Sequence, residues 1–79
     1  MQVQIQLFAS LASYLPADSR GKAMDLEVEP GSTIGQALDK LQIPMDSVKL
    51  IFQNGIHAKL EDTLQENDRI GVFPPVGGG

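Results

Sequence analysis

The sequence contains no cysteine and only one histidine, His57. Without cysteine the chain can form no disulfide, no thiolate metal site and no cysteine nucleophile. A single histidine needs several carboxylates around it to hold a metal ion. Three acids, Asp25, Glu27 and Glu29, alternate along a predicted strand and would share one face, in the way that solvated side chains do. We therefore expect no metal site and no bound cofactor.

Basic residues are also few, since six Lys and Arg face ten Asp and Glu and the formal net charge is −4. Nucleic-acid binding requires basic stripes that displace phosphate counterions, so this charge argues against nucleic acid and against anionic membranes. It permits a basic protein partner. Apolar runs are short, and the N-terminus lacks the basic region and apolar block of a signal peptide, so we expect a cytoplasmic location.

The chain of 79 residues, of which 42% are hydrophobic, has material for one domain with one core. That core leaves no room for a separate deep substrate pocket. No nucleophile and base converge in the sequence, so we expect a protein that is not an enzyme by itself.

Alternating polar and apolar residues predict two strands in the first third of the chain. Gln2–Phe8 forms the first strand, with Phe8 on the outward face, and 23–29 forms the second. We expect the two strands to pair antiparallel. Between them, 9–14 has the composition of a short helical turn and 16–21 that of a loop.

One amphipathic helix is predicted after the second strand. Thr33 and Gln36 have the spacing of a capping box, and Pro44 is expected to end the helix. Apolar residues follow at i, i+3, i+4 and i+7, which places them on one stripe that we assign to the core. They are Ile34, Ala37, Leu38 and Leu41.

Three further strands are predicted at 48–53, 56–58 and 69–73. Asn54-Gly55 is a strong signal for a type I′ hairpin between the first two. Within 48–53 we expect Leu50 and Phe52 to point inward and Ile51 outward. Asn67-Asp68 predicts a second turn, Leu60 and Leu64 are expected to fill the core, and Ile70 and Val72 share the inner face of the last strand.

The predicted order is β-β-α-β-β-β, which favours an α+β fold of the β-grasp, ubiquitin-like type. The helix covers one face of a mixed sheet of four to five strands, and the first and last strands lie side by side. We expect a β-grasp domain over 1–74 and a flexible glycine tail over 75–79.

The tail carries the unusual chemistry of the sequence. Pro74 and Pro75 favour an extended rod, and the glycines after them have no Cβ to block a narrow tunnel. From Phe73 to Gly79 full extension reaches roughly 20 Å. With Gly79 as the terminal residue, we expect its carboxylate to be adenylated and then converted by a sulfur nucleophile into a thiocarboxylate.

The segment from Arg69 to Gly79, with Phe-Pro-Pro-Val before the glycines, resembles the small sulfur-carrier subunit of molybdopterin synthase (MoaD-type). Leu7–Leu11 resembles the same family, and Leu50–Phe52 resembles ubiquitin. The resemblance implies an E1-like adenylating enzyme that uses ATP, a sulfur donor and a large synthase subunit, commonly in a heterotetramer. The carrier then supplies sulfur to a pterin precursor for molybdenum cofactor biosynthesis.

A docking surface beside the tail is predicted from the outward phase of the strands. Its expected members are Phe73, Phe8, Ile51 and His57, with His57 at the rim. Pro75, Val76, Gly77 and Gly78 are expected to thread into the partner, so that Gly79 reaches the reaction site.

Other functions are compatible with the same residues. A carrier for thiamine or another pathway would use identical chemistry with another acceptor enzyme. A ubiquitin-like modifier would form isopeptides through the same terminus, and a passive β-grasp interaction module would leave the tail inert.

Overall fold

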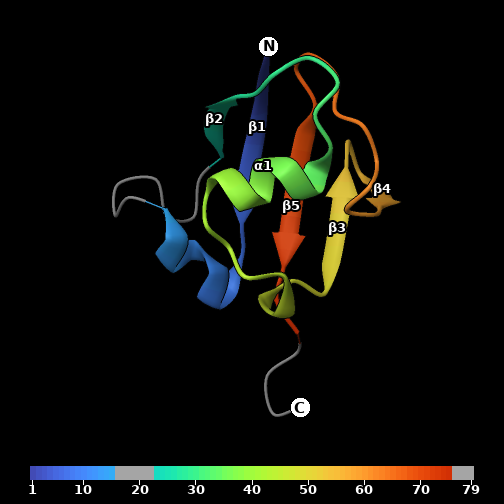
Figure 1. The fold of residues 1–79 in the computed structure, drawn as a ribbon. Helices are drawn as coiled ribbons and strands as arrows, with labels where there is room; N and C mark the ends of the chain where they lie inside the picture. The colour runs from blue at the N-terminus through green and yellow to red at the C-terminus, as the bar shows by residue number, and fades with distance from the viewer. Residues whose placement is uncertain (16–22, 76–79) are drawn as a thin grey trace.

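The computed structural model describes residues 1–15 and 23–75 (Figure 1). The predicted loop at 16–21 and the tail residues Val76, Gly77, Gly78 and Gly79 lie outside the described residues. In chain order the elements are β1 (Gln2–Leu7), the 3₁₀ helix η1 (Ala9–Tyr14), β2 (Met24–Glu27), the helix α1 (Ile34–Lys40), the 3₁₀ helix η3 (Met45–Ser47), β3 (Leu50–Gln53), β4 (Ile56–Ala58) and β5 (Arg69–Phe73).

The five strands form one mixed sheet in the order β2-β1-β5-β3-β4. β1 and β5 run parallel at its centre, while β2 pairs antiparallel with β1, and β3 pairs antiparallel with both β5 and β4. Helix α1 crosses one face of this sheet (Figure 1). This is the β-grasp, ubiquitin-like fold, so the predicted fold class is confirmed with five strands.

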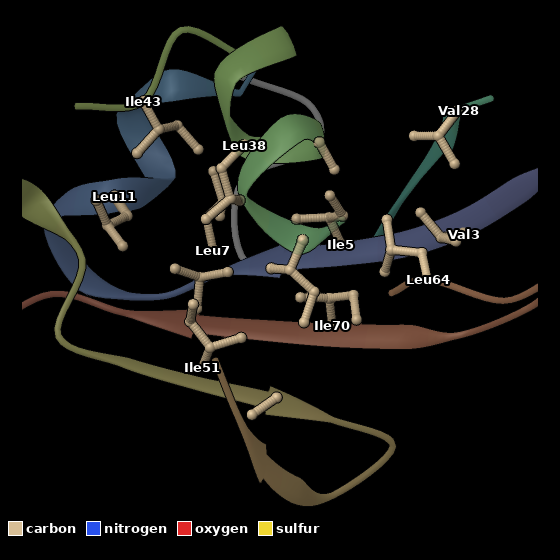
Figure 2. Close-up of a cluster of buried hydrophobic side chains, with 14 of the residues drawn as sticks. Val3, Ile5, Leu7, Leu11, Val28, Leu38, Ile43, Ile51, Leu64 and Ile70 are labelled. Carbon is tan, nitrogen blue, oxygen red and sulfur yellow. The ribbon is translucent and has the colours of Figure 1, made fainter. Parts of the chain in front are cut away.

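The core lies between α1 and the inner face of the sheet (Figure 2). Inward residues of β1 and β5 meet the buried stripe of α1, whose Leu38 is 0% exposed. Leu11 of η1 and Ile43 after the helix close the same end of the core, and Leu64 is buried as predicted. Leu41 and Leu60 are only partly buried at its margin.

The ends of α1 follow from its capping residues. Thr33 accepts a hydrogen bond from the Gln36 backbone N–H, and the Gln36 side chain accepts one from the Thr33 N–H, which confirms the capping box. At the other end Gln42 has a φ of 62°, and the N–H of Ile43 donates back to Leu38. The helix therefore ends at Lys40, before Pro44, which instead precedes η3.

The predicted phase of β3 is wrong. Ile51 is 4% exposed and Leu50 is 40% exposed, so Ile51 points into the core and its two neighbours point out. Ile51 lies opposite Val72 of β5 and Ala58 of β4, which both face the core. Leu50, Ile51 and Phe52 are all apolar, so alternation within this strand gave no signal for the face.

A buried carboxylate joins the β3–β4 hairpin to the start of β5. Asp68 accepts hydrogen bonds from the Gln53 side chain (2.7 Å), the Asn54 side chain (2.9 Å) and the Gln65 backbone N–H (2.8 Å). Asn54 in turn accepts from the Arg69 backbone N–H. Burial of the Asp68 carboxyl raises its pKa, but the three hydrogen bonds together outweigh this, and the pKa lies below the ordinary value.

The position of the helix predicts the cost of truncating its central side chain. Leu38→Ala removes a fully buried side chain, and the resulting cavity should lower the free energy of unfolding by about 2–5 kcal/mol. Ile56→Ala is the control, because Ile56 is 72% exposed and its truncation should change stability by less than about 0.5 kcal/mol. Urea unfolding measures both, and equal effects would contradict this packing.

The Asp68 network predicts a dependence of stability on pH. Because the folded state lowers the pKa of Asp68, this stabilisation is complete above the unfolded pKa, close to 3.8, and is lost as the pH falls through the folded pKa. Asp68→Asn should cost about 1–3 kcal/mol at neutral pH and flatten the fall in stability below pH ~4. Asp25→Asn, on the exposed face, is the control for urea unfolding across this pH range, and an unchanged acid profile in Asp68→Asn would contradict the assignment.

Candidate functional site

Aromatic side chains gather on the outer face of the sheet, opposite α1. The rings of Phe8 and Phe73 stack with centroids 4.2 Å apart and an interplanar angle of 1°. Phe52 meets Phe73 edge-on at 5.8 Å, and His57 meets Phe52 edge-on at the same distance. Leu50, directly opposite Phe73, adds an exposed aliphatic side chain. These five residues, which come from β3, β4, β5 and the position after β1, are named the aromatic surface.

Strand register explains why these residues meet. Phe8 follows β1, and its backbone N–H donates to Val72 of β5, which brings its ring beside Phe73. Two residues before Phe73 on β5, Gly71 lies opposite Phe52 of β3, and Phe52 lies opposite His57 of β4. The aromatic surface is therefore made of two adjacent cross-strand rows.

Gly71 provides the space in which the aromatic rings lie. A Cβ at this position would lie 3.4 Å from the Phe8 ring and 3.9 Å from the Phe73 ring. A methyl group would thus already contact both rings, and a larger side chain would have to displace them. The small residue in the middle of β5 leaves a groove of about 280 Å³ on the outer face, bordered by Phe8, Phe52 and Phe73.

The aromatic surface lies at the end of the sheet from which the chain continues toward the tail. The carbonyl of Phe73 accepts a hydrogen bond from the Lys49 backbone N–H (2.8 Å). Pro74 follows and has no N–H, so it cannot donate a further ladder bond. Pro75 is exposed. Phe73, the last residue of β5, is thus fixed by its backbone pairing and by its ring contacts just before the tail begins.

The structure brings together three of the four residues predicted for docking. Phe8, Phe73 and His57 lie on the outer face as expected, and buried Ile51 does not. Leu50 and Phe52 were assigned to the core by sequence and belong to the site instead. The two-residue turn could have given the correct face of Phe52. Counting outward from Asn54-Gly55 pairs Phe52 with His57, so the two side chains must share a face, and His57 was expected on the outer one.

Other classes of site have little support in the described part of the chain. Over 1–15 and 23–75 no group of three or more His, Asp and Glu residues is arranged to hold a metal ion. Among the described helices, none has the length and apolarity needed to cross a bilayer. The tail positions Val76 to Gly79, including the predicted reactive Gly79, lie outside the described residues.

The sequence matches the family model described as Mut7-C ubiquitin (Ub-Mut7C) over residues 1–77. The chain belongs to the Mut7-C ubiquitin family. No curated protein matches the sequence.

Solved structures extend the comparison. SAMP1 from Haloferax volcanii is 28% identical, with a TM-score of 0.75 and 100% of each chain covered. The small archaeal modifier protein 1 from Methanosarcina acetivorans is 25% identical, with a TM-score of 0.70 and coverage of 99% of this chain and 96% of the other.

A complex of subunits 1 and 2 of the molybdopterin-converting factor from Helicobacter pylori also contains a similar chain. The identity is 19%, the TM-score 0.59, and 100% of each chain is covered. At that identity the likeness is one of fold. This Mut7-C ubiquitin family member is therefore a small ubiquitin-like β-grasp protein, similar at 25–28% identity to small archaeal modifier proteins.

Proposed function

We propose that this protein is a sulfur carrier in molybdopterin biosynthesis and that the carboxylate of Gly79 is its reactive group. One observation carries the proposal: the segment Pro74–Gly79, two prolines and a valine before three glycines, directly follows a core strand and begins beside a partly exposed aromatic surface. In this proposal residues 1–74 form the domain that docks, 75–79 form the tail that enters the partner, and the carrier is not itself an enzyme.

The chemistry requires two successive nucleophilic displacement reactions at the C-terminal carboxylate. A carboxylate oxygen of Gly79 attacks the α-phosphorus of ATP and displaces pyrophosphate, which leaves an acyl adenylate. Hydrosulfide then attacks the carbonyl carbon, the bond to AMP breaks, and a proton is released as the thiocarboxylate forms. Both steps belong to an activating enzyme, so ATP is that enzyme's substrate and the carrier itself needs no bound cofactor.

The sequence of the tail suits entry into an enclosed site. Pro75 restricts φ near the start, and Val76, Gly77 and Gly78 lead to Gly79 with little or no side-chain bulk beside the reacting carbonyl. Six residues beyond Phe73 reach roughly 20 Å when extended. Because Phe73 is fixed by its pairing with β3 and by two ring contacts, the tail has a defined origin on the docking face.

The aromatic surface is the proposed docking site for the partners. Exposed apolar patches on a small protein mark interfaces, and aromatic residues are enriched among interface hot spots. The proposed partners are an adenylating enzyme and the large subunit of molybdopterin synthase, which would receive sulfur from two charged carriers to build a dithiolene. The choice of molybdopterin as the acceptor pathway rests on the sequence Phe73-Pro74-Pro75-Val76 and the glycines after it.

A second candidate function is protein modification. Its support is the 28% identity over the full length of SAMP1 from Haloferax volcanii, a protein whose family name is small archaeal modifier protein. The same adenylate would then be attacked by a lysine amine of another protein to form an isopeptide. Lysine adducts after incubation with a cell extract, identified by peptide mass spectrometry, would favour modification, and a stable thiocarboxylate would favour sulfur transfer to molybdopterin or another pathway.

The proposal predicts that charging depends on the position of the terminal carboxylate. An activating enzyme must hold it near the α-phosphate at about 3–3.5 Å. Adding one alanine after Gly79, or deleting Gly79, moves the terminus by about 3.5 Å. Both variants should lose adenylation and sulfur loading with the cognate activating enzyme, ATP and sulfide, while the domain stays folded. Intact-mass spectrometry detects the exchange of one oxygen for sulfur.

Two results would overturn the carrier proposal. One is equal charging of the native chain and the variant with the added alanine. The other is sulfur that maps to a residue other than Gly79. Circular dichroism of each variant provides the control for folding, since both changes lie after the last strand.

Docking through the aromatic surface makes a separate prediction. Phe73→Ala should weaken binding to the large synthase subunit by about 2 kcal/mol or more if the ring is a central anchor. Ile56→Ala is the matched control, because it removes an exposed apolar side chain outside the aromatic surface. Isothermal titration calorimetry measures both affinities, and an unchanged affinity for Phe73→Ala would place the interface elsewhere.

A further inference from the structure

The groove beside the aromatic surface is lined in part by Arg69, whose charge the fold does not use. The described lining is otherwise apolar and amide-rich, and within residues 1–15 and 23–75 Arg69 is the one charged residue of that lining. Across residues 1–15 and 23–75, the Arg69 side chain is part of no hydrogen bond or ion pair; only its backbone groups are bonded. Arg69 is also exposed, so its guanidinium is available to a partner.

The surroundings of Arg69 do not neutralise this charge. Its cross-strand neighbour on β1 is the neutral Gln4, and Asn54 lies beside it on the other flank. Asp68 precedes it, but that carboxylate is buried and accepts three hydrogen bonds within the fold. Asp25 lies opposite Gln4 on the next strand, two strand spacings or about 10 Å away. A chain of net charge −4 thus presents an uncompensated cation at its apolar groove.

We propose that this groove recognises an extended segment of a partner protein in which an apolar residue and an acidic residue stand two positions apart. The apolar side chain enters the groove over Gly71, between Phe52 and the stacked pair of Phe8 and Phe73. The carboxylate pairs with the Arg69 guanidinium, whose planar fork of donors suits a carboxylate. This inference refines the docking part of the proposed function and rests on that part alone.

The spacing follows from the geometry of β5. Arg69 and Gly71 are two residues apart on one face of the strand, about 6.6 Å along it. In an extended partner, side chains at i and i+2 also share a face at that spacing. The groove volume of about 280 Å³ is at or below the lower end for small-molecule pockets, roughly 300–1,000 Å³, and suits a single apolar side chain.

Short peptides test the recognition directly. The probes are acetyl-Gly-Leu-Thr-Asp-Gly-amide and the same peptide with Asn or Lys in place of Asp, titrated into the ¹⁵N-labelled chain at low salt. We expect the Asp peptide to shift the amide signals of Gln6, Gly71 and Phe73. The Asn peptide should bind about 2- to 5-fold more weakly, as loss of an exposed ion pair implies, and the Lys peptide more weakly still.

Charge reversal provides the decisive variant. Arg69→Glu should reverse the order, so that the Lys peptide binds more tightly than the Asp peptide, and high salt should reduce the preference in both proteins. Lys59→Glu is the matched control, because it makes the same change of charge outside the groove lining and should keep the native preference. Phe52→Ala should weaken all three peptides without changing their order.

Each of the following outcomes would overturn the inference: equal binding of the Asp and Lys peptides to the native chain, shifts located away from the groove, or the same effect from Lys59→Glu as from Arg69→Glu. An absence of shifts at tens of millimolar peptide would also overturn it. Sulfur loading of Gly79 involves none of these peptides, so failure here would leave the carrier chemistry intact, and failure of sulfur loading would leave peptide recognition intact.

Discussion

The parallel pairing of β1 with β5 is the interaction on which the rest of this fold depends. Ile5 lies opposite Ile70 and Leu7 opposite Val72, and all four side chains are buried beneath α1. β2 reaches the sheet only through β1, and the β3–β4 hairpin only through β5. Because the two central strands come from opposite ends of the sequence, their pairing must overcome the entropy of closing a long loop, and the apolar contact with the helix stabilises that closure.

The same pairing also builds the outer face. When Leu7 and Val72 point into the core, the next residues, Phe8 and Phe73, are left on the opposite side and their rings stack. Gly71 leaves the space beside them that a larger residue would fill. A core requirement on one face of a sheet thus determines which residues are displayed on the other, and it places the aromatic surface next to the origin of the tail.

The proposed roles of this small protein fall on two different parts of the chain. In the proposed function the domain supplies the docking face and the origin of the tail, and the chemistry belongs to a terminal group beyond it. In the proposal for the groove, Arg69 gives the docking face a means of selecting partners that a uniform apolar patch lacks, because a wrong charge opposite Arg69 would be repelled. The Asp68 carboxylate, by contrast, accepts its three hydrogen bonds from groups within the domain and holds the hairpin to β5.

Sequence alone determined the elements whose signals are local. Alternation predicted β1 and β5, the capping box placed the start of α1, and Asn54-Gly55 predicted the hairpin, because each depends on residues close together in the chain. The phase of β3 was decided only by tertiary structure. Three consecutive apolar residues satisfy either face, and only the register with β5 puts Ile51 against Val72 and leaves Leu50 and Phe52 outside. The aromatic surface and the unpaired charge beside it arise from that register, because pairing between distant strands brings together residues that no local pattern connects.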